Sequence, residues 1–122
     1  MTARYVFAVE FRVPVDDPEL RLDPETFETK LYRSAAPPGE EGWLFFRNNL
    51  WRGEVGDETH LRQLASEELG VDVEAVEYRA FETDEAYIDA LKAEIAADLD
   101  PFNADSVTEV LSKYFSSSLE VE

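Results

Sequence analysis

Alternating polarity near the N-terminus places the strongest constraint on the fold. In residues 4–13 (RYVFAVEFRV), every second side chain is large and apolar: Tyr5, Phe7, Val9, Phe11 and Val13. A β-strand directs every second side chain to the same face, so this segment predicts a strand with one apolar face. That face must be covered, and the chain therefore requires a sheet with a packed layer on one side.

The next three segments follow from proline, glycine and alternation. Residues 14–24 are rich in proline and acids and predict a loop, and residues 36–42 predict a turn. Residues 25–35 leave two alternatives open. Pro24 lies where a helix could begin, but Phe27, Thr29 and Leu31 alternate, and we favour a strand on that ground.

Residues 43–55 (WLFFRNNLWRGEV) are dense in aromatic side chains, which are typical of strands. They predict one central strand, or two strands that meet in a hairpin at Asn48 and Asn49, since asparagine tolerates left-handed backbone conformations.

Three helices are predicted in the second half. Asp57 is a good N-cap for a helix over residues 58–69, and Gly70 is a good stop. A second helix starts at Thr83 or Asp84 and must end before the proline at position 101. Ser106 and Glu109 match a capping box, which predicts the start of the last helix.

Two further strands complete the expected sheet. Residues 71–81 predict a strand whose buried face changes near Ala75, as at a bulge. Leu119 and Val121 predict a short edge strand. We therefore expect a single α+β domain over residues 1–122, with a mainly antiparallel sheet of four to five strands and about three helices packed on one face. If residues 25–35 were a helix and Asn48-Asn49 a hairpin turn, the first 80 residues would have the ferredoxin-like order βαββαβ.

The large negative net charge of the chain indicates that it works at high salt concentration. The chain has 28 acidic and 11 basic residues, a net charge of −17, and the acids run from Glu10 to Glu122 instead of forming a tail. Self-repulsion of this size strains a compact state in dilute buffer, and molar salt screens it. We expect a halophilic protein adapted to salt; the alternative is an acidic protein that binds a basic partner.

The absence of cysteine excludes disulfides and thiolate chemistry, and the absence of a long apolar run predicts a cytoplasmic protein without membrane contact.

Two arginines stand out in so acidic a chain. Arg47 and Arg52 form the one close pair of bases without crowding acids, which is too little for a nucleic-acid-binding stripe. Together with Asn48, Asn49 and Trp51 they could bind a small anionic ligand, through guanidinium forks and a stacking ring. The structural alternative pairs both arginines with the nearby acids, places Trp51 in the core, and uses the amides to shape a turn. We favour the structural alternative.

His60 is the chain's single histidine and the natural candidate for acid–base catalysis. Its position in the first turn of a predicted helix favours an ordinary surface histidine. No metal-binding or cofactor-binding motif is present, and residues 98–105, which hold several acids, are interpreted as two helix caps around a proline. We lean against an enzyme and predict no cofactor, no metal and no catalytic residue.

Two stretches carry a resemblance to a known family. GWLFFRNNLWRGEVGDE at residues 42–58 and SKYFSSSLEV near the C-terminus resemble the LWR-salt proteins, a small haloarchaeal family named for a Leu-Trp-Arg triplet, here Leu50, Trp51 and Arg52. The resemblance covers the whole chain. It implies a halophilic protein and carries over no activity and no site residues.

Two functions remain. We favour a non-catalytic interaction or accessory protein that presents its aromatic segment and last helix to a protein partner or to another copy of itself. The alternative is a binder of small anionic ligands, or an enzyme, built around Arg47, Trp51, Arg52 and His60.

Overall fold

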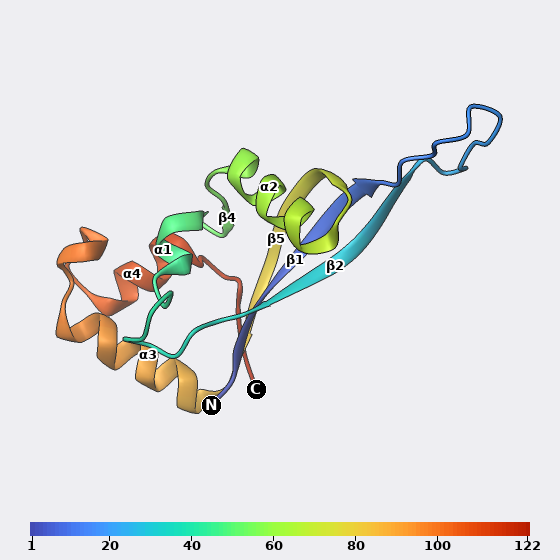
Figure 1. Ribbon diagram of the computed structural model, residues 1–122. Helices are drawn as coiled ribbons and strands as arrows, with labels where there is room; N and C mark the ends of the chain where they lie inside the picture. The colour runs from blue at the N-terminus through green and yellow to red at the C-terminus, as the bar shows by residue number, and fades with distance from the viewer.

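The computed structural model describes residues 1–122 and contains a four-stranded sheet covered by helices (Figure 1). The strand order is β2-β1-β5-β6, from β1 (Ala3–Arg12), β2 (Thr26–Ser34), β5 (Asp72–Thr83) and β6 (Leu119–Val121). The first three strands pair antiparallel and β6 pairs parallel to β5. A second, two-stranded sheet consists of β3 (Leu50–Trp51) and β4 (Glu54–Val55). The expected α+β class and mainly antiparallel sheet are confirmed.

The helices agree well with the capping signals. α2 (Glu58–Leu69) is capped by Asp57 and stopped by Gly70 in the left-handed conformation. α3 (Glu85–Ala97) begins after Asp84, whose carboxylate accepts the N–H of Tyr87. α4 (Val107–Tyr114) begins after Ser106 in the same way. A short 3₁₀ helix, η1 (Asp100–Phe102), fills the connection between α3 and α4.

The alternating face of β1 forms the centre of the core. Tyr5, Phe7 and Val9 belong to a cluster of 19 buried residues that includes side chains from every helix. β5 keeps an apolar face toward this cluster by two register shifts against β1. One is the change expected near Ala75. The other, near Ala80, was not predicted. Residues 13–25 extend beyond the end of the sheet as a long loop, shown in blue at the upper right of Figure 1.

The prediction for residues 43–55 was wrong. Phe45–Asn49 form a helix, α1, and the turn between β3 and β4 lies at Arg52-Gly53 instead of Asn48-Asn49. The physical reason is tertiary packing. Phe46, only 1 % exposed, stacks on Phe102 and Phe115. A helix allows this because it places Phe46 and Asn49, its two buried residues, on one face.

The ferredoxin-like order is not found, because residues 26–34 are the strand β2 that we favoured and not a helix. None of the helices combines the length and the apolar character that a bilayer-spanning segment needs.

Candidate functional site

The Leu-Trp-Arg triplet forms a hairpin that closes the end of α4. Leu50 is buried, and Arg52 and Gly53 form the turn with φ of 52° and 77°, the two positive values that a type I′ hairpin turn requires. The N–H groups of Arg52 and Gly53 donate to the carbonyls of Lys113 and Tyr114 at 2.8 and 2.9 Å. The last carbonyls of a helix lack partners within the helix, so the hairpin tip supplies donors that α4 needs.

Trp51 lies on the outside of this junction. Its side chain is 45 % exposed and meets Tyr114 edge-on, with ring centroids 6.1 Å apart. The guanidinium carbon of Arg52 and the Nζ of Lys113 each lie 5.6 Å from the centroid of the indole ring. The structure therefore places two cations beside one exposed aromatic ring, within the range of cation–π attraction.

The two cations have no carboxylate partner. Neither Arg52 nor Lys113 belongs to any of the five ion pairs of the chain. The Nζ of Lys113 donates instead to the carbonyls of Phe102 and Asn103 at 2.9 and 3.3 Å. Their charge is available to an anionic group in a chain whose net charge is −17.

A shallow depression of about 740 Å³ surrounds Trp51. It contains a single carboxylate, and Glu109 already accepts the N–H of Asp105 at 2.9 Å. The other lining groups are the two cations, the ring and four hydroxyls. We call these residues the Trp51 surface: Trp51, Arg52, Lys113, Ser106, Thr108, Ser112 and Ser116.

Arg47 does not join this surface. Its guanidinium binds the Oδ1 of Asn48 at 3.0 and 3.2 Å and approaches the carbonyl of Pro101 at 3.5 Å. The expected pairing of Arg47 and Arg52 with nearby acids is therefore wrong for both, since neither forms an ion pair. Arg47 binds its neighbour Asn48, and the guanidinium of Arg52 lies beside the ring of Trp51. The two arginines do not converge on one ligand position.

The remaining predicted site residues have local structural roles. Asn49 is buried, and its amide donates to the carbonyl of Phe45 at 3.0 Å inside α1. The backbone N–H of His60 donates to the Asp57 cap, but the imidazole forms no hydrogen bond or ion pair and does not line the Trp51 surface. Trp51 was expected in the core under the structural alternative and is half exposed. No group of three or more His, Asp or Glu side chains is arranged to hold a metal ion.

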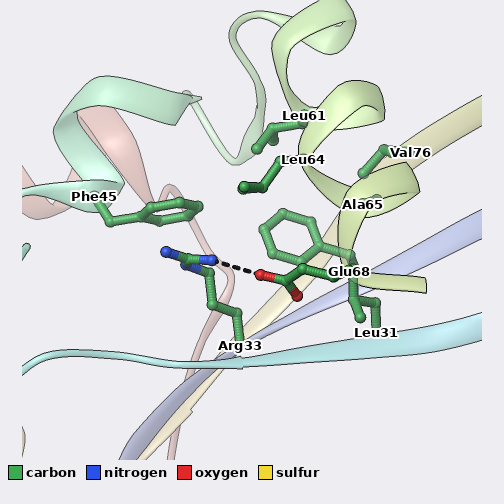
Figure 2. Close-up of a pocket in the computed structure, with 9 residues that line it drawn as sticks. Leu31, Arg33, Phe45, Leu61, Leu64, Ala65, Glu68 and Val76 are labelled. Carbon is green, nitrogen blue, oxygen red and sulfur yellow. Dashed lines mark hydrogen bonds and ion pairs between the residues drawn. The ribbon is translucent and has the colours of Figure 1, made fainter. Parts of the chain in front are cut away.

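Two features were missed at the level of sequence. Lys113 is distant from Trp51 in the chain, and its one signal was the scarcity of lysine. The second is an apolar crevice of about 20 Å³ between β2, α1 and α2 (Figure 2). At its mouth, Arg33 pairs with Glu68 at 3.1 Å and lies over the ring of Phe45 at 4.7 Å. The space is too small for more than a water-sized molecule.

Comparison with known proteins identifies a family whose name refers to the Leu-Trp-Arg triplet of this hairpin. No curated protein and no solved structure matches the chain significantly. The family model described as LWR-salt protein matches residues 1–122, the full length of the chain. The chain therefore belongs to the LWR-salt protein family.

Proposed function

We propose that this protein is a non-catalytic accessory protein that binds an acidic segment of a partner protein through the Trp51 surface. One observation carries the proposal: Trp51, 45 % exposed, has both Arg52 and Lys113 within 5.6 Å of its ring centroid, and neither cation is ion-paired. Tryptophan and arginine are the residues most enriched where single side chains dominate binding between proteins.

The shape of the site favours a protein segment over a small molecule. Ligand pockets are concave and mostly apolar, whereas the Trp51 surface is open and Trp51 is its one hydrophobic member. An extended acidic segment can cover the ring, pair with both cations and reach the surrounding hydroxyls.

A high salt concentration would also favour a protein segment that covers the Trp51 ring. We infer from the net charge of −17 that the protein works in a salt-rich cytoplasm. At molar salt the Debye length is about 3 Å, so charge pairs at an exposed interface contribute little beyond direct contact. Burying the indole ring supplies a contribution that salt does not screen.

The second candidate is a small anion. Arg52, Lys113 and four hydroxyls surround the depression, and this donor set suits a phosphate or carboxylate group. In this case the indole ring would stack on the ligand, and no partner protein would be needed.

Affinity capture from host extract in molar KCl tests the proposal. The immobilised baits are the wild type, Trp51→Ser and Arg52→Gly. Leu69→Ser removes another exposed apolar side chain, and Arg21→Gly removes another exposed loop arginine, so these two are the matched controls.

We expect one partner protein to be retained by the wild type and by both controls, and to be lost from Trp51→Ser and Arg52→Gly. Equal capture by Trp51→Ser would exclude this surface. If the wild type retained a metabolite and no protein, and Arg52→Gly lost it, the second candidate would replace the first.

A further inference from the structure

The outer edge of β2 is long and unpaired. β2 is the terminal strand of the sheet and pairs only with β1. The N–H of Ala35 donates to the carbonyl of Ala3 at 2.9 Å, in line with the β1–β2 register. Because antiparallel pairs alternate, the odd-numbered residues of β2 direct their backbone groups toward β1. The even-numbered residues direct theirs outward: Thr26, Glu28, Lys30, Tyr32 and Ser34.

Two of the features that usually block strand addition are missing from this edge, although it carries charged side chains at Glu28, Lys30 and Arg33. Its register with β1 is free of bulges, and β2 contains no proline. Figure 1 shows β2, in cyan, along the border of the sheet without another strand beyond it. Open edges of this kind readily add a strand from another chain.

The charges on β2 are poorly matched within one molecule. Glu28 lies directly opposite Glu10 on β1, and like charges in this position are destabilising. Lys30 lies opposite Ala8 and forms no ion pair. The strand thus carries a surplus carboxylate and an unmatched ammonium two residues apart on the same face.

We propose that β2 pairs antiparallel with β2 of a second copy, about a two-fold axis through Thr29, to form a continuous eight-stranded sheet from two four-stranded ones. In this register Glu28 of each copy lies opposite Lys30 of the other. Both residues direct their backbone groups outward, so the pair also forms the ladder hydrogen bonds.

The neighbouring registers are worse on charge alone. Moving the axis to Glu28 places two glutamates opposite each other, and moving it to Lys30 places two lysines opposite each other. Shifts that pair even with odd residues match outward-facing with inward-facing backbone groups and form no ladder. Charge complementarity therefore selects the axis at Thr29.

The proposed pairing also covers a residue of the apolar crevice. Leu31 lines the crevice, and Figure 2 shows it on β2 below α2. In the proposed register Phe27 of the second copy lies opposite Leu31, on the same face of the sheet. Leu31 and Phe27 are only partly covered in one chain, and strand addition buries both.

Charge reversal on β2 tests the pairing. The variants are Glu28→Lys, Lys30→Glu and the double exchange of both residues. Glu67→Lys and Lys92→Glu make the same charge changes on exposed helix positions and serve as controls. Molar mass is measured by sedimentation equilibrium across a KCl series and up to millimolar protein, with circular dichroism as the check of folding. Glu28→Lys removes the repulsion with Glu10, so a loss of dimer in this variant does not arise from unfolding.

We expect the wild type and both controls to reach twice the 13.9 kDa of one chain. Each single reversal should lower the mass to that of one chain, because two like-charged pairs then meet at the axis. The double exchange should restore the dimer, and an equimolar mixture of the two single variants should form a heterodimer. A wild type that stays monomeric throughout, or single reversals that dimerise as well as the wild type, would overturn the proposal.

Discussion

The backbone N–H of Arg52 donates to the carbonyl oxygen of Lys113 at 2.8 Å, so the tip of the β3–β4 hairpin closes the C-terminal end of α4. This contact holds Arg52 at φ 52°, a left-handed conformation that costs a non-glycine residue roughly 1–2 kcal/mol. Glycine removes this strain but raises the entropy of the unfolded chain by a comparable amount. We therefore expect Arg52→Gly to change the free energy of unfolding by less than about 1 kcal/mol, measured by urea denaturation in molar KCl.

The matched variant is Arg52→Val, whose β-branched side chain fits this conformation poorly. It should be less stable than Arg52→Gly by roughly 2 kcal/mol. Equal stability of the two variants would mean that the turn at Arg52 is not left-handed in solution.

The burial of Phe46 distinguishes the helix found at residues 45–49 from the strand that the aromatic composition predicted. Its ring is 1 % exposed and contacts the rings of Phe102, Tyr114 and Phe115. Phe46→Ala should therefore cost about 3–5 kcal/mol of unfolding free energy. Asn48 is exposed, and Asn48→Ala should cost less than about 0.5 kcal/mol. A continuous strand would place both side chains on one face, so similar costs would contradict the helix.

The success of the sequence-based predictions follows the range of the interactions. The caps of α2, α3 and α4 depend on residues within one turn of Asp57, Asp84 and Ser106, and these helices were located correctly. The burial of Phe46 depends on aromatic rings more than fifty positions later in the chain, and the residues next to Phe46 in the sequence do not indicate that contact.

The positions of the candidate site residues follow the same rule. The sequence groups Trp51 with Arg52, and the structure places the guanidinium of Arg52 5.6 Å from the centroid of the Trp51 ring, which is a local contact. Arg47 was grouped with them by proximity in sequence, yet it turns toward the η1 segment. Lys113 completes the site from another element, and its role depends on a hairpin-to-helix contact that one sequence cannot show.

Buried tyrosines predict a loss of stability in alkali. Burial raises the pKa of Tyr87 to about 12, from an ordinary value near 10, and burial also raises the pKa of Tyr5 and Tyr78. Well below pH 10 each of these rings is protonated in both the folded and the unfolded chain. Between pH 10 and pH 12 the unfolded chain releases the proton of Tyr87 first, so the free energy of unfolding falls as pH rises.

Tyr87→Phe isolates this effect. At neutral pH it loses the hydrogen bond from the Tyr87 hydroxyl to the carbonyl of Ala36, which is 2.7 Å long, at a cost of about 1 kcal/mol. Position 87 of the variant cannot ionise, so the free energy of unfolding of the variant should fall less steeply above pH 10 and its gap to the wild type should narrow. Denaturation curves from pH 8 to roughly pH 11 measure this gap, and a constant gap would argue against the raised pKa.

Salt should stabilise this fold, because its surface leaves most carboxylates unpaired. Of 28 acidic residues only Asp84, Glu82, Glu74, Glu68 and Glu77 form ion pairs, and all five pairs are substantially exposed and therefore weak. We expect the melting temperature to rise with KCl, with much of the gain complete before molar salt, since the Debye length shortens from about 10 Å at 0.1 M to about 3 Å at 1 M. Sorbitol at matched water activity is the control, because it is excluded from the surface but does not screen charge. Equal melting temperatures in dilute buffer and in molar KCl would refute the halophilic interpretation of the charge, and an equal gain with sorbitol would assign the effect to exclusion of solute instead of screening.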